Sequence, residues 1–154
     1  MLSEARAQFG DDKKVLKKLA TLVDSQEGSV ADGATWLIKD CAESGVVPSP
    51  SDVAEIVSRL DAIPTWQAAL HLCQCAAFFD FTPDQARQFA GWVEQFRDHE
   101  RPFLRAWSMD ALHHTAKQAP DLAPRAARAL SIAEKDKAAS VRARARNVRA
   151  AGPG

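Results

Sequence analysis

The 154-residue chain lacks an excess of charge, a long apolar run and an even number of cysteines. Its 20 basic and 20 acidic residues cancel, so bulk charge gives no reason to expect a polyanion as ligand and leaves that role to a local patch. The longest apolar runs are far shorter than the roughly 20 residues of a membrane span. Three cysteines argue against a disulfide framework. Residues 1–10 show no apolar signal-peptide core, so we expect a cytoplasmic protein that binds no membrane.

Helical periodicity runs along most of the chain, whereas strand alternation is missing over any useful length. In eight segments, apolar residues recur every three or four positions, as in amphipathic helices. These segments lie at about residues 11–24, 29–45, 52–61, 64–77, 82–98, 101–118, 121–133 and 139–151. The chain is therefore predicted to be all-α, with eight helices in four pairs that form a single domain over residues 1–154.

Small polar residues mark where two of these helices begin. Ser51 and Asp52 are suited to cap the third helix, and Thr82 is suited to cap the fifth. The seventh helix has the thinnest apolar face, because most of that face is alanine. Its core-facing residues are predicted to be Ala126, Ala127, Leu130 and Ala133.

Four aspartates recur with a nearly constant spacing. Asp24, Asp61, Asp98 and Asp136 are separated by 37, 37 and 38 residues, and each stands between two helical segments. Periods of this length are typical of α-solenoids, in which each helix pair buries its apolar face against its neighbours. We expect these carboxylates to play structural roles, accepting backbone N–H groups at the next helix start and facing arginines of a neighbouring repeat.

Two similar segments suggest a family. Residues 103–112, with the sequence FLRAWSMDAL, are followed 37 residues later by residues 140–146, with the sequence SVRARAR. Both resemble the second helix of HEAT repeats, where an apolar–Arg–Ala opening recurs from repeat to repeat. The resemblance implies a right-handed α-α superhelix of about four helix pairs, whose concave face binds another protein or a peptide.

The resemblance also implies a ladder of ion pairs, because HEAT repeats carry an Asp in the turn and an Arg six residues later. Asp136 and Arg142 have this spacing, and Arg105 stands seven residues after Asp98. Gln67 follows Asp61 at the matching place, and no basic residue follows Asp24 there. The motif therefore covers the second half of the chain.

Charge is unevenly distributed although its sum is zero. Residues 24–61 hold eight acidic and two basic residues, and residues 120–154 hold eight basic and three acidic residues. One hypothesis from this asymmetry is that the basic end of one molecule docks on the acidic half of another.

Two helices carry candidate contact residues. On the last helix three arginines follow one another at i, i+4 and i+7, whereas Arg144 falls nearly opposite them. On the sixth helix Asp110, His113 and Lys117 form a mixed polar line at i, i+3 and i+7, away from the apolar stripe. The predicted partner-binding residues are Arg105, Asp110, His113, Lys117, Arg142, Arg146 and Arg149.

Two classes of function fit these features. The first is a non-enzymatic adaptor that binds another protein or a peptide, because stacked helix pairs give an extended surface. The second is a DNA-binding protein, because some small DNA glycosylases that excise alkylated bases are built from HEAT-like repeats and hold the damaged nucleotide with aromatic and acidic residues. Trp107 and Asp110, three residues apart, resemble such a pair. Binding to duplex DNA that weakens steeply as salt rises separates the two classes.

No catalytic residue, bound metal or cofactor is expected. His71, Cys73 and Cys75 have a spacing that invites zinc, but on one helix Cys73 points well away from the face that the other two share. We therefore interpret the thiols as core residues. His113 and His114 likewise diverge by about 100° around their helix.

Overall fold

The computed structural model describes residues 12–152 and is all-helical, with no strand, over that range. The α-helices of this range are α2 (Asp12–Ala20), α3 (Gly28–Glu43), α4 (Pro50–Ser58), α5 (Trp66–Cys75), α6 (Pro83–Val93), α7 (Pro102–Gln118), α8 (Ala123–Ala133) and α9 (Ala139–Ala151). Short 3-10 segments adjoin some of them and are η1 (Leu60–Ala62), η2 (Ala76–Phe78), η3 (Glu94–Phe96) and η4 (Pro120–Leu122). Each α-helix overlaps one predicted segment, which confirms the all-α prediction.

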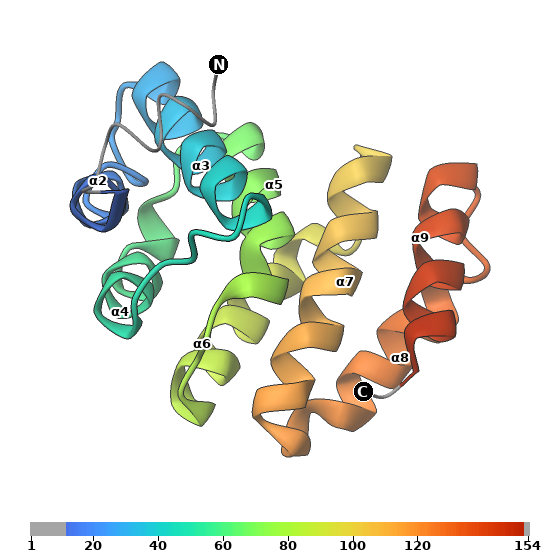
Figure 1. Cartoon of the computed structure of the whole chain (residues 1–154). Coiled ribbons are helices and arrows are strands. Elements are labelled where there is room, and N and C mark those ends of the chain that lie inside the picture. Colours follow the sequence, from blue (N-terminus) through green and yellow to red (C-terminus); the bar gives the residue numbers. More distant parts are fainter. Residues whose placement is uncertain (1–11, 153–154) are drawn as a thin grey trace.

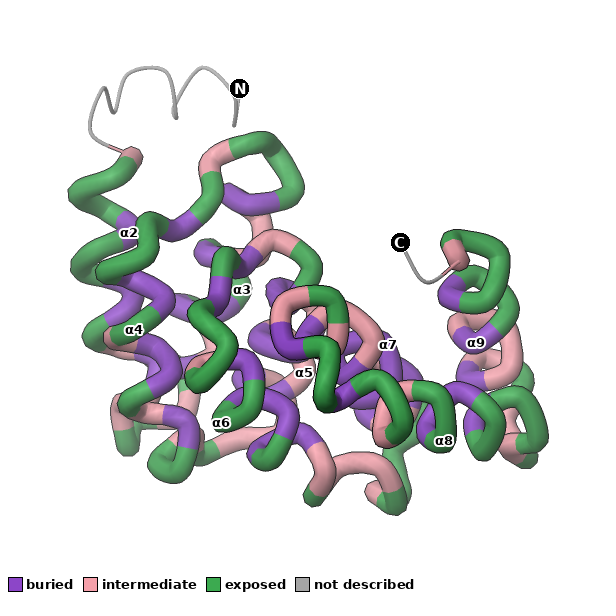
Figure 2. The backbone as a smooth tube through the Cα atoms, turned by 90° about the horizontal axis from the view of Figure 1, so that it is seen from below, coloured by how far each residue is buried: buried purple, intermediate pink, exposed green. Residues whose placement is uncertain are grey.

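The helices lie in two rows (Figure 1). One row, here called the odd row, consists of α3, α5, α7 and α9, each of which contacts the next. The even row begins with α2, α4 and α6, which also contact one another in order, and continues with α8, which packs on α7 and α9. Contacts of α2 with α3, α6 with α7 and α8 with α9 join the rows. Figure 2 shows that buried residues lie where helices face one another and exposed residues on the outside.

Capping side chains define two helix starts. In α4, Ser49 Oγ accepts a hydrogen bond from Asp52 N, and Asp52 Oδ2 accepts one from Ser49 N, both at 3.1 Å. This reciprocal pair is a capping box, and it places the cap two residues before the predicted Ser51. The predicted cap at Thr82 is confirmed, because its hydroxyl accepts a hydrogen bond from Gln85 N.

Aromatic residues fill the core beside α6. Neighbouring rings in this group have centroids 5.0–6.3 Å apart, and most of them meet edge to face. The group consists of Phe79, Phe81, Phe89, Trp92 and Phe96. Phe79 and Phe89 are among the largest fully buried side chains of the described chain. Packing of this kind adds specific ring contacts to the burial of apolar surface.

One side-chain amide ties the end of α7 to the segment before α6. Gln118 Nε2 donates to the Phe79 carbonyl oxygen at 3.0 Å, and Phe81 N donates to Gln118 Oε1 at 2.6 Å. The side-chain amide of Gln118 thus provides hydrogen bonds for a backbone N–H group and a backbone carbonyl group that lie between helices. It holds two rings of the aromatic group against α7.

The last even-row helix, α8, has a thin apolar face made mostly of alanine, as its sequence predicts. Its buried residues are Ala129, Leu130 and Ala133, whereas Ala127, predicted to face the core, is exposed. Ion pairs supplement this thin face. Arg87 of α6 donates to both carboxylate oxygens of Asp121 in η4, at 3.0 and 3.1 Å. Arg125 of α8 reaches Glu94 of η3 at 3.2 Å.

No helix within residues 12–152 combines the length and the apolar character needed to cross a membrane.

Candidate functional site

Two of the four periodic aspartates bind arginines across the helix pairs. Asp24 accepts hydrogen bonds from Arg59 Nη1 at 3.0 and 3.2 Å. Asp136 accepts two parallel hydrogen bonds from Arg105, both at 2.9 Å, and a third from Ala138 N at 2.8 Å. The hydrogen bonds from Arg105 are the main cause that lowers the pKa of the Asp136 carboxyl. Asp136 thus makes both predicted structural contacts, whereas Asp24 makes only the contact with an arginine. Arg105, predicted to bind a partner, has its guanidinium in the contact with Asp136, and its side chain is only 10% exposed.

The other two aspartates lack that role. Asp61 and Asp98 are exposed, and neither side chain forms a hydrogen bond or ion pair with another residue of the described range. Thr65, whose hydroxyl accepts a hydrogen bond from Ala68 N, caps α5 instead. The prediction of a cap or ladder contact is therefore wrong for both residues.

For Asp98 the cause is a difference in register. Arg142 Nη1 donates to the carbonyl oxygen six residues before it, at Asp136, and Arg105 Nη1 donates in the same way to His99, six residues before it. His99 Nδ1 also accepts a hydrogen bond from Arg101 N, as the Asp136 carboxylate does from the N–H two residues on. His99, one residue after Asp98, thus holds the position equivalent to Asp136.

A cleft opens on the odd row, and we call it the odd-row cleft. It has a volume of about 270 Å³ and is lined by residues of α3, α5, η2, α7 and α9. The lining residues are Lys39, Glu43, Gln74, Ala77, Phe78, Trp107, Asp110, His114 and Arg144. Four successive helices of the row therefore contribute to one surface.

One wall of the odd-row cleft is a polar cluster built on α7 and closed by α9. Asp110 is buried, with 6% of its side chain exposed, and its carboxylate lies 3.4 Å from Arg144 Nη1 and 3.4 Å from His114 Nε2. The Arg144 guanidinium stacks over the Trp107 ring, 4.3 Å from its centroid. Such stacking of a cation on an aromatic face is attractive and orients the guanidinium. Trp107 and Asp110 are therefore brought together, as predicted, but Arg144 covers them.

The opposite wall comes from α3. Lys39 Nζ donates to Glu43 Oε1 at 3.0 Å, so the two charges of this wall are paired along one helix face. Trp36, three residues before Lys39, is 44% exposed but does not line the cleft, whose aromatic lining residues are Phe78 and Trp107. The cleft thus offers carboxylates, cations and aromatic surface side by side.

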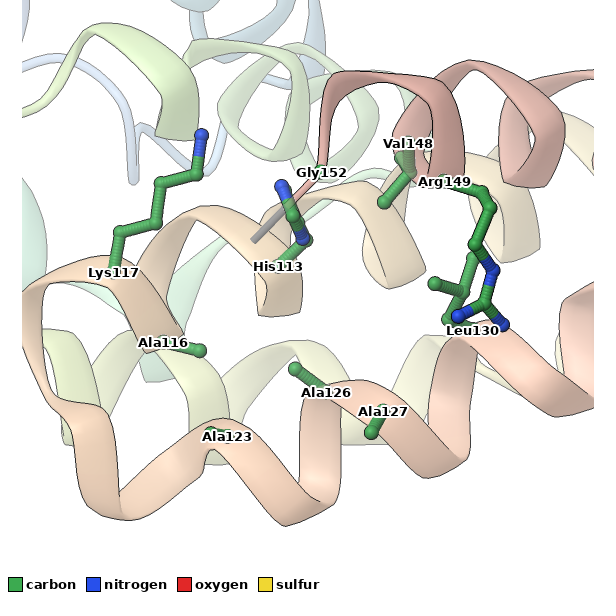
Figure 3. A pocket seen from close by; sticks show the side chains of 10 residues that line it. All are labelled: His113, Ala116, Lys117, Ala123, Ala126, Ala127, Leu130, Val148, Arg149 and Gly152. Carbon is green, nitrogen blue, oxygen red and sulfur yellow. The ribbon is translucent and has the colours of Figure 1, made fainter. Parts of the chain in front are cut away.

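The predicted polar line on α7 is divided between two places. Asp110 lies in the odd-row cleft, whereas His113 and Lys117 line a second cavity of about 380 Å³ between α7, α8 and α9 (Figure 3). We call this the C-terminal cavity. Its lining residues are His113, Ala116, Lys117, Ala123, Ala126, Ala127, Leu130, Val148, Arg149 and Gly152. The prediction that Asp110, His113 and Lys117 form one surface is therefore wrong.

The arginines of α9 do not form one free stripe either. Arg142 is partly buried and bound to the Asp136 carbonyl, and Arg149 makes two hydrogen bonds with Glu134 at 2.7 and 3.1 Å. Arg146 is exposed and forms no ion pair with any residue between 12 and 152. Among the three arginines of the predicted stripe, Arg146 is the one whose side chain forms neither a hydrogen bond nor an ion pair with residues 12–152.

The thiols of α5 lie in the core. Cys73 and Cys75 are fully buried, and burial raises the pKa of both thiols. His71 lies apart from them, with Nδ1 2.9 Å from the Thr35 hydroxyl of α3. Among residues 12–152, no three His, Cys, Asp or Glu side chains are grouped so that they could hold a metal ion.

Sequence reasoning missed the α3 wall and the role of Arg144. A Lys39–Glu43 pair at i, i+4 is a common feature of exposed helices, so it gave no signal of a cleft. The sequence correctly predicts that Arg144 lies on the side of α9 opposite the three other arginines. In the structure this side of α9 faces α7. Arg144 becomes part of the cleft because α9 packs on α7, and the sequence alone does not predict that contact.

Acidification from about pH 7.5 to about 5.5 is expected to lower the free energy of unfolding. Burial, followed by the charge of Lys39, lowers the pKa of His71, and burial, followed by the charge of Lys117, lowers the pKa of His113. As pH falls, the unfolded chain takes up protons at these histidines before the folded chain does, so the folded state loses stability. Urea titrations at both pH values measure the loss.

The carboxyls with lowered pKa, Asp121, Glu134 and Asp136, titrate below this window, because their ordinary pKa values are already 3.8–4.5. A double variant, His71→Gln with His113→Gln, is expected to show a smaller loss over the same range. An undiminished pH dependence in that variant would contradict the assignment to these two histidines.

Comparison with family models, with curated proteins and with solved structures found no match for the chain.

Proposed function

We propose that the chain is a HEAT-like α-solenoid, a right-handed superhelix of four helix pairs forming one domain over residues 1–154. Two features of the described part support this proposal. Successive helices of the odd row contact one another in order, as stacked repeats require. The hydrogen bonds of Arg105 and Arg142 recur at equivalent positions 37 residues apart.

We further propose that the protein is a non-enzymatic interaction module whose odd row is the concave, partner-binding face. The observation that carries this proposal is the odd-row cleft, a surface built by four helices on which paired charges and an aromatic ring meet. Surfaces of this kind, mounted on a rigid scaffold, are typical of binding sites in repeat proteins. The proposal includes a cytoplasmic location, the absence of a cofactor and a protein or peptide as partner.

A peptide suits the chemistry of the cleft. A peptide backbone presents N–H donors and C=O acceptors in alternation. The exposed Glu43 carboxylate accepts hydrogen bonds, and the cations of Lys39 and Arg144 donate them. Phe78 and Trp107 line the cleft and add aromatic surface, which is enriched in the centres of protein interfaces. An extended segment of a partner protein can therefore satisfy both kinds of group along the odd row.

Partner capture is expected to depend on Arg144. In pull-downs from native cytoplasm with the full chain as bait, proteins retained by the wild type are expected to fall at least about tenfold with Arg144→Ala, since a central interface arginine often contributes about 2 kcal/mol or more. Arg128→Ala is the matched control, because Arg128 is an exposed arginine of α8 outside the cleft. Quantitative mass spectrometry compares the three baits, and equal retention by both variants would remove the cleft from the proposal.

A DNA-binding protein is the second candidate, favoured by the grouping of Trp107, Asp110 and Arg144 in one cleft and by the unpaired Arg146. Duplex DNA distinguishes it from an adaptor. A nucleic-acid binder loses affinity steeply as salt rises, because neutralised phosphates release counterions, whereas an adaptor binds no DNA at modest salt. Steeply salt-dependent binding that weakens with Arg146→Ala would replace the adaptor proposal.

A further inference from the structure

The C-terminal cavity is a separate concavity with features of a small-molecule site. Its volume of about 380 Å³ lies at the lower end of the roughly 300–1,000 Å³ usual for ligand pockets. It arises because α8 turns mostly alanines toward α7 and α9, and a methyl group cannot fill the space between helices. Leu130 and Val148 complete an apolar floor. The cavity opens to solvent beside Ala127 and Lys117, which are exposed.

Two polar groups on α7 border this apolar space without partners of their own. The Nε2 atom of His113 is buried and has no hydrogen-bond partner in the described structure. Lys117, one turn later, is exposed and makes no hydrogen bond or ion pair with another residue between 12 and 152. Figure 3 shows both side chains extending to the same side of α7. A buried polar atom without a partner is costly, so a ligand that supplies one is favoured.

The charge around the cavity favours a single negative charge. Arg149 lies across the cavity from Lys117, but Glu134 neutralises it through two hydrogen bonds. The Asp110 carboxylate is engaged by Arg144 and His114 in the odd-row cleft. Lys117 therefore remains as the one unbalanced charge among the described lining residues.

We propose that the C-terminal cavity binds a small monocarboxylate. Its apolar body lies on the alanines of α8 and on Leu130 and Val148, and its carboxylate accepts a hydrogen bond from Lys117 Nζ. With the ring of His113 turned so that its buried Nε2–H faces the ligand, the carboxylate accepts a second hydrogen bond there. No bond is made or broken, so the site is one of binding only. The proposal does not depend on the function assigned to the odd-row cleft.

The test uses 3-phenylpropanoate and its uncharged analogue 3-phenylpropanamide, titrated into the ¹⁵N-labelled full chain and followed by amide chemical shifts. Saturable shifts confined to α7, α8 and α9 are expected for the acid. The acid is expected to bind at least about tenfold more tightly than the amide, because only the acid forms a charge-assisted hydrogen bond with Lys117 Nζ. Bound carboxylate also stabilises protonated His113, so the His113 ring resonances are expected to titrate at higher pH with the acid present.

Three variants sharpen the test. Lys117→Gln is expected to weaken the acid about tenfold and to leave the amide unchanged, whereas the matched control Lys13→Gln, on α2, is expected to change neither. Ala126→Leu places a larger side chain in the cavity and is expected to abolish binding of both probes while the chain stays folded by circular dichroism. Equal affinity for acid and amide, an unchanged affinity in Lys117→Gln, or shifts that do not saturate would each overturn the proposal.

Discussion

Replacement of Phe89 by alanine is expected to lower the free energy of unfolding by about 3–5 kcal/mol, the largest loss we expect from a single substitution. Phe89 is fully buried, and its ring lies 5.1 Å from that of Phe81 and 5.4 Å from that of Trp92. Alanine would remove apolar contact and leave a cavity that rigid neighbouring helices close only in part. Urea unfolding followed by circular dichroism measures the change.

Phe103→Ala is the control for this experiment. Phe103 is 61% exposed at the start of α7, so its removal is expected to change stability by no more than about 0.5 kcal/mol. A loss at Phe89 as small as that at Phe103 would mean that the aromatic group beside α6 is not packed as described.

Arg105→Ala is expected to cost about 2 kcal/mol, between the small value of exposed ion pairs and the roughly 3–5 kcal/mol for breaking fully buried ones. The side chains of Arg105 and Asp136 are 10% and 13% exposed, and two parallel hydrogen bonds join them. Without the arginine, the Asp136 carboxylate keeps only the backbone N–H of Ala138, and the carbonyl oxygen of His99 loses a donor. A double-mutant cycle with Asp136→Ala isolates the coupling between the two side chains.

The pair of Arg87 and Asp121 provides the comparison, because it has the same two-bond geometry at much greater exposure, 46% and 55%. Solvent screens such pairs, so its double-mutant cycle is expected to show little coupling. Coupling of equal size in both pairs would show that burial does not set the strength of the Arg105 contact.

Periodicity predicted the helices because each one buries a single stripe. The apolar residues of α4 and α6 recur at helical spacing, and Thr82 marks the start of α6 as expected. The ends of helices were less accurate. α2 was predicted to reach Asp24, but it ends at Ala20 and is followed by turn structure up to Asp24. The pattern of apolar side chains is similar in a last α-helical turn and in a tighter turn, so it does not locate the end of the helix.

The site was harder to predict than the fold, because it depends on how the repeats align with one another and on which helices pack together. The spacing of aspartates suggested that Asp98 matches Asp136, but hydrogen bonding shows that His99 does, and imidazole Nδ1 accepts an N–H as a carboxylate does. Asp110 and Lys117 share a face of α7, yet seven residues span about 10 Å of helix axis. Arg144 of α9 covers the first of these positions, while the second borders the C-terminal cavity.

The ion pairs that supplement the thin face of α8 make the packing of α8 more sensitive to salt than the aromatic core beside α6. Dissolved ions weaken exposed pairs such as Arg87–Asp121 but leave the burial of Phe89 almost untouched. Amide protons of α8 should therefore exchange with solvent faster at high ionic strength, through partial openings in which the last hairpin separates while α4 and α6 stay closed. Ionic strength would then act on the shape of the C-terminal cavity without unfolding the chain.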